Sequence, residues 1–102
     1  MNAKICMKLR HAQGEVLLAA ADSDLLNQEI RSGKLHLKVS PDFYGDVPVD
    51  DGLFLDSLAM CTIANLVGEY VVRLAIEKDF IDPENVLYIG KVPHAQFARM
   101  EE

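Results

Sequence analysis

The residues best suited to binding or catalysis gather where the predicted regular structure is interrupted. Asn65, Gly68 and Glu69 lie at the junction of two predicted helices, His94 lies in a proline-containing turn, and Tyr44 lies in a loop. The N–H groups that open a helix favour an anion, and a histidine that titrates near neutral pH suits acid or base catalysis. These five residues form our candidate binding patch.

The same five residues also have a purely structural interpretation. Asn65 would end the first helix, Gly68 would permit the bend, and Glu69 would place its charge in the first turn of the second helix. A turn histidine is more commonly hydrogen-bonded to a backbone carbonyl, and a loop aromatic such as Tyr44 more often plugs the end of a core. Both interpretations stay open on the sequence alone.

Other kinds of chemistry lack their motifs. None of the glycine-rich phosphate-binding patterns or nucleophile-elbow patterns is present. The histidines lie on different predicted elements, and the acidic cluster lacks the residue order of a calcium loop. That cluster consists of Asp42, Asp46, Asp50, Asp51 and Asp56. We therefore expect a solvated acidic loop, no metal and no cofactor, and the sequence assigns no catalytic residue.

The longest apolar block, from Asp50 to Phe80, is predicted to form two helices joined across residues 65–69. Asp50 and Asp51 lie where N-capping carboxylates belong. The first of these helices is apolar nearly all round, which is typical of a central helix or of an interface. The off-stripe apolar residues are our candidate interface for a protein partner or a homo-oligomer: Phe54, Met60, Cys61 and Ile63.

The remaining elements complete an α+β pattern. Strands are predicted over residues 4–10, 15–21, 35–39, 85–89 and 94–100, a short helix follows Asp22 as far as Ile30, and residues 41–48 form a loop. In the first strand, Ile5, Met7 and Leu9 share one face. The order β-β-α-β-α-α-β-β predicts a largely antiparallel sheet with the helix pair packed on one side, within a single domain over residues 1–102.

Composition limits the partners and the compartment. The formal net charge is −6, so non-specific nucleic-acid binding is not expected. No apolar run is long enough to span a membrane, and the N-terminus does not have the pattern of a signal peptide. We therefore expect a cytoplasmic protein with no membrane association, in which Cys6 and Cys61 are buried thiols rather than a disulfide.

Four short motifs together resemble a known family. They occupy residues 22–26, 41–45, 65–69 and 93–96, and the resemblance is to the short archaeal proteins known as domain of unknown function 424. It implies an archaeal, cytoplasmic, single-domain protein, sometimes encoded near translation-factor genes, with no established activity or catalytic residue. One departure is Asn27, where the family resemblance leads us to expect glycine.

Two hypotheses of function follow. The first is a non-catalytic binding or adaptor module, linked to the translation apparatus, that holds a protein partner. The alternative is a small enzyme or small-molecule-binding protein with a polar pocket at the helix junction.

Overall fold

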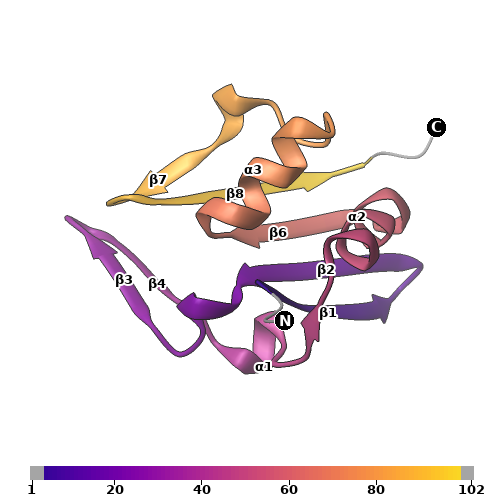
Figure 1. Ribbon diagram of the computed structural model, residues 1–102, viewed down its shortest axis with the longest axis horizontal. Coiled ribbons are helices and arrows are strands. Elements are labelled where there is room, and N and C mark those ends of the chain that lie inside the picture. Colours follow the sequence, from indigo (N-terminus) through magenta and orange to yellow (C-terminus); the bar gives the residue numbers. More distant parts are fainter. Residues whose placement is uncertain (1–3, 100–102) are drawn as a thin grey trace.

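The computed structural model describes residues 4–99, and a six-stranded sheet forms its centre (Figure 1). The strands are β1 (Ile5–Ala12), β2 (Glu15–Asp22), β3 (Glu29–Ser32), β4 (Leu35–Lys38), β5 (Pro48–Val49), β6 (Ile63–Val67), β7 (Leu87–Ile89) and β8 (Val92–Ala98). The helices are α1 (Pro41–Tyr44), α2 (Asp51–Met60) and α3 (Glu69–Glu77), with single 3-10 turns at Ser23–Leu25 and Pro83–Asn85.

The sheet has the strand order β5-β1-β2-β6-β8-β7, and β3 and β4 form a separate hairpin. Among the strands of residues 4–99, only β2 and β6 pair in parallel, and every other neighbouring pair is antiparallel. The α+β class and the largely antiparallel sheet expected from the sequence are therefore confirmed. None of the helices between residues 4 and 99 is long and apolar enough to cross a membrane.

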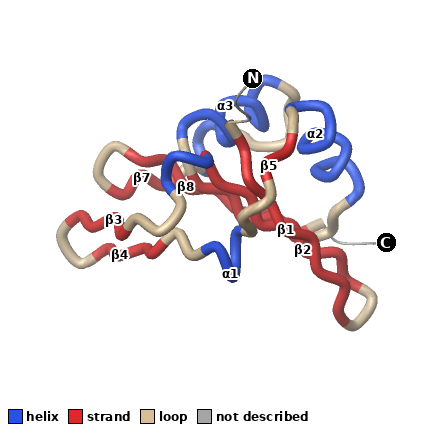
Figure 2. The backbone as a smooth tube through the Cα atoms, turned by 60° about the horizontal axis from the view of Figure 1, so that its bottom comes forward, coloured by secondary structure: helices blue, strands red, loops and turns tan. Residues whose placement is uncertain are grey.

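The two faces of the sheet are covered differently (Figure 2). Helices α2 and α3 lie on one face, as predicted for the helix pair, over a core to which β2 contributes Leu18 and Ala20 and β6 contributes Ala64 and Leu66. On the other face, α1 and the β3–β4 hairpin form a smaller cluster with Ala19, Ala21 and Val67. Because side chains alternate along a strand, odd-numbered residues of β2 and β6 face this second side.

The prediction of a helix running to Asn65 is wrong. Helix α2 ends at Met60, and residues 63–67 form β6, a central strand between β2 and β8. Sequence periodicity misses such a strand because a short apolar run buried on both faces does not alternate.

The guanidinium of Arg99 donates to the carbonyls of Leu58 and Cys61 at the end of α2, where a helix leaves acceptors unsatisfied.

Three other segments also differ from the prediction. The short helix after Asp22 reduces to one 3-10 turn, the strand at 35–39 pairs with a strand at 29–32, and the loop at 41–48 contains α1 and the start of β5. The last strand ends at Ala98, and Met100 lies outside the described residues. Asn27 has a φ of 69°, so the turn survives without glycine because asparagine tolerates the left-handed region.

Gly68 precedes α3, and a side chain at this position would disturb the start of the helix. Its φ is 120°, and an added Cβ would overlap the carboxylate of Asp22, which accepts hydrogen bonds from the N–H groups of Tyr70 and Val71, each at 3.0 Å. We expect Gly68→Ala to lower the free energy of unfolding by about 3 kcal/mol, through backbone strain and loss of this cap.

The matched control for this urea-unfolding measurement is Gly33→Ala. Gly33 also has positive φ, 60°, but an added Cβ would have no neighbour within 4 Å. It should cost only about 1 kcal/mol, from backbone strain alone. Equal losses in the two variants would show that the Asp22 cap contributes nothing.

Candidate functional site

Three residues of the predicted patch meet on the face of the sheet opposite α2 and α3. The hydroxyl of Tyr44 donates to Asn65 Oδ1 at 2.8 Å, and His94 Nε2 lies 3.1 Å from the same oxygen. An amide oxygen only accepts hydrogen bonds, so Nε2 of His94 carries the proton and donates. One residue each from α1, β6 and β8 thus forms a closed polar network.

Burial keeps both donors of this network neutral. It raises the pKa of Tyr44 to about 12, and it lowers the pKa of His94 from its ordinary value of 6.5. Each group directs its proton at Asn65 Oδ1. The network therefore fixes the orientation of the Asn65 amide.

The oriented amide faces a groove that we call the sheet groove. Asn65 Nδ2 lies 3.5 Å from Gln96 Oε1, and these residues are register partners on β6 and β8. The hollow beside them has a volume of about 130 Å³. Its other lining residues are mainly apolar and come from β1, β2, β6 and α1: Arg10, Leu17, Leu18, Ala19, Phe43, Ile63 and Ala64.

The side of the sheet groove next to β1 is positively charged, and we call it the positive wall: Arg10 lines the hollow, and Lys8 lies beside it as the register partner of Ala19. The guanidinium of Arg10 donates to the carbonyls of Asp42 and Phe43 and lies 5.0 Å from the centroid of the Phe43 ring. Lys8 Nζ donates to the same Asp42 carbonyl at 3.1 Å. Within residues 4–99, neither cation forms an ion pair with a carboxylate.

Sequence reasoning missed Arg10, Phe43 and Gln96 as site residues. Because Ile5, Met7 and Leu9 share one face of the first strand, Lys8 and Arg10 fall on the other face, and this is the available signal for the positive wall. Gln96 carries no such signal, because only its cross-strand register with Asn65 brings it to the groove.

The other two residues of the predicted patch do not join the network. Gly68 donates its N–H to the Pro93 carbonyl at 2.9 Å, but Glu69 lies in a separate hollow of about 370 Å³ at the start of α3. The Asp22 carboxylate already accepts from the first N–H groups of this helix. Burial, with smaller contributions from Asp24 and Glu69, raises the pKa of Asp22, while its backbone hydrogen bonds lower it.

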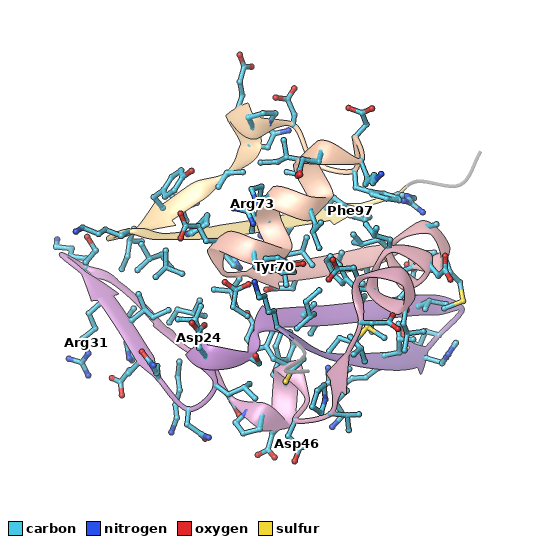
Figure 3. The ribbon with its side chains drawn as sticks, viewed as in Figure 1. Asp24, Arg31, Asp46, Tyr70, Arg73 and Phe97 are labelled. Atoms are coloured by element: carbon cyan, nitrogen blue, oxygen red, sulfur yellow. The ribbon has the colours of Figure 1, made fainter. Side chains whose placement is uncertain are left out.

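The hollow at the start of α3 is lined by charges of both signs. Figure 3 labels Tyr70 and Arg73 on α3 and Asp24 below them, and all three line this hollow together with Lys4. Lys4 Nζ and Arg73 Cζ lie 5.2 and 5.6 Å from the centroid of the Tyr70 ring. Two cations thus lie within cation–π distance of the same ring.

The four residues of the candidate interface do not form one surface. Phe54 and Cys61 are buried in the core beneath the helices, whereas Met60 is 54 % exposed. Ile63 lies on β6 and lines the sheet groove. Because the helix ends at Met60, the helical face on which the four were grouped does not exist.

The acidic cluster has structural roles at Asp50 and Asp51, since Asp51 Oδ2 accepts from the hydroxyl of Tyr70 on α3 at 2.6 Å. Asp50 Oδ1 accepts from the N–H of Leu53 at 2.8 Å and so caps α2, as expected. Asp42, Asp46 and Asp51 are exposed. In the part of the chain that the structure describes, three or more His, Cys, Asp or Glu side chains nowhere converge as a metal site would require.

The fold and the groove define a small α+β domain with a helix pair on one face of its sheet and a small hollow on the other. The chain belongs to the family described as "Protein of unknown function (DUF424)", whose model matches residues 10–100. The resemblance seen in the four motifs is thereby confirmed.

A solved structure shares this fold. It is described as the crystal structure of an uncharacterized conserved protein from Methanopyrus kandleri, with a TM-score of 0.79 and 20% sequence identity over 96% of this chain and 95% of that one. A search of curated proteins gave no match.

Replacement of Asn65 tests the network. Asn65→Leu removes the shared acceptor and leaves two donors without a partner, so we expect the free energy of unfolding to fall by about 3 kcal/mol. Tyr44→Phe alone should cost about 1 kcal/mol, whereas in the Asn65→Leu background it removes an unpaired donor and should restore part of the lost stability. Equal effects of Tyr44→Phe in both backgrounds, measured by urea unfolding, would show that the hydrogen bond does not contribute.

The lowered pKa of His94 gives a pH dependence with a definite sign. The folded chain disfavours protonated His94, so the unfolded chain binds more protons below about pH 6.5, and stability falls as the pH drops towards the folded-state pKa. His94→Gln keeps an N–H donor and should remove this part of the loss between pH 7 and 5. The matched control is His11→Gln, which replaces an exposed histidine outside the network.

Proposed function

We propose that the protein is a non-catalytic binding module that holds a protein partner at the sheet groove. The observation that carries this proposal is the size of the hollow, about 130 Å³. Pockets for free small molecules usually measure about 300–1,000 Å³. A hollow of this size suits one side chain of a larger partner, whose remaining surface lies outside it.

The rim of the groove supports the same proposal. Phe43 is 44 % exposed at the groove wall, and an aromatic ring beside an arginine is a common composition for the centre of a protein interface. The network behind the groove holds Asn65 in one orientation, which lowers the entropy lost on binding.

The alternative, a small-molecule site at the helix junction, corresponds to the hollow at the start of α3. Its volume of about 370 Å³ falls within the usual range. However, Asp22 already occupies the N–H groups that would attract an anionic ligand. The sheet groove is therefore our preferred site.

The setting of the interaction is also part of the proposal. Cys6 and Cys61 are free thiols, as in proteins of a reducing compartment, so we propose a cytoplasmic partner. The family resemblance suggests the translation apparatus as the first place to search. With a net charge of −6, we expect contact with a protein component rather than with RNA.

Photo-crosslinking tests the proposed function. We expect benzoylphenylalanine at position 43 to crosslink a protein in an extract of the native host, because Phe43 borders the groove. Gln96→Trp, which places a bulky ring at the groove rim, should abolish that crosslink. The crosslinked species is read by electrophoresis and mass spectrometry.

The matched control is the same crosslinker at position 53. Leu53 is 49 % exposed and belongs to α2, which lies on the opposite face. A partner captured from position 53 and not from position 43 would move the binding surface to the helices. Capture that persists with Gln96→Trp would show that the partner does not bind at the groove.

A further inference from the structure

We propose that the sheet groove binds an extended, acidic peptide segment of its partner. In this inference, which rests on the proposed function, an aliphatic side chain of the segment fills the hollow and a neighbouring carboxylate meets Lys8 and Arg10. The size of the groove supports the aliphatic side chain, its two amide groups support the extended backbone, and its positive charge supports the carboxylate.

The hollow fits one apolar side chain. Leu17, Ala19 and Ile63 supply apolar lining, and the volume is about 130 Å³. An apolar protein cavity of about 150 Å³ stays dry and accommodates a benzene molecule. An aliphatic side chain of similar size would leave water on entering, and this burial supplies the non-directional part of the affinity.

The two amides fit a peptide backbone. Asn65 and Gln96 are register partners on adjacent strands, so their side chains project from the same face of the sheet. Asn65 Oδ1 already accepts from Tyr44 and His94, and one N–H of Nδ2 is directed at Gln96 Oε1. The second N–H of Nδ2 is a donor suited to a peptide carbonyl. The Nε2 group of the exposed Gln96 adds further donors, and its Oε1 can accept a second hydrogen bond, as an extended segment requires.

The positive wall selects an acidic segment. Lys8 and Arg10 donate to backbone carbonyls of α1, and carbonyls carry no net charge to neutralise them. A carboxylate that approaches this wall gains charge-assisted hydrogen bonds. A nucleic acid would also meet these cations, but its many phosphates would be repelled by a protein of net charge −6, so we infer a peptide.

Selection from a peptide library tests this inference. The full chain is used to select from a phage-displayed library of random dodecapeptides, and the dissociation constants of the selected peptides are measured by fluorescence anisotropy. We expect sequences in which Asp or Glu lies within two positions of Leu, Ile, Val or Met. Binding should weaken as the salt concentration rises.

Variants then assign the two contacts. Lys8→Glu should weaken the selected peptides about tenfold, and the same variant should prefer a peptide in which Lys replaces the acidic residue. Gln96→Trp should abolish binding by filling the groove. Lys91→Glu, at an exposed lysine in the turn between β7 and β8, should leave the affinity unchanged. Melting curves establish that each variant is folded.

Several results would overturn the inference. These are the selection of no peptide, selected peptides without an acidic residue, and binding that Gln96→Trp does not affect. Binding of a mixed-sequence single-stranded RNA that is lost with Lys8→Glu and Gln96→Trp would assign the groove to nucleic acid instead. If crosslinking from position 43 still captures a protein while peptides fail, the proposed function stands and only the linear acidic segment is rejected.

Discussion

The parallel pairing of β2 with β6 is the constraint on which the rest of the structure depends. The two strands pair from Leu17 with Ile63 to Ala21 with Val67 at the centre of an otherwise antiparallel sheet. Parallel neighbours cannot be joined by a tight turn, so residues 23–62 must cross from one end of the pair to the other. This connection carries the β3–β4 hairpin and α1 across one face and α2 across the other (Figure 2). The groove face is thus a consequence of the crossover.

The small and polar residues of this central pair shape the groove. Three consecutive alanines in β2 are poor strand formers, but Ala20 packs beneath the helices while Ala19 and Ala21 face α1 and the hairpin. Ala19 leaves the hollow open where a larger side chain would fill it. Beside it, Asn65 brings an amide into a central strand, and the hydrogen bonds from Tyr44 and His94 offset the cost of burying its oxygen.

The sequence predicted those parts of the fold that local patterns specify. The alternation of β1 correctly placed Ile5, Met7 and Leu9 towards the helix-side core, and Asp50 was correctly identified as a cap. Strand β6 was missed because its pairing joins residues distant in the chain and both of its faces are covered. Tyr44, Asn65 and His94 were grouped because each interrupts a pattern, although the helix junction that motivated the grouping is absent.

What the sequence could not supply is cross-strand register. Lys8, Ala19, Asn65 and Gln96 come from four strands, and successive register pairs align them in one row across the sheet. Neighbours within such a row interact directly, but no spacing within the chain encodes the row. The acidic composition likewise describes the whole surface and not the groove. The screening length is about 8 Å at physiological ionic strength, so a single carboxylate in the groove experiences chiefly Lys8 and Arg10, whereas a polyanion that extends over the surface also meets the carboxylates behind the net charge of −6. A protein that repels polyanions can therefore still attract one carboxylate at this wall, and the choice of ligand depends on local geometry rather than on composition.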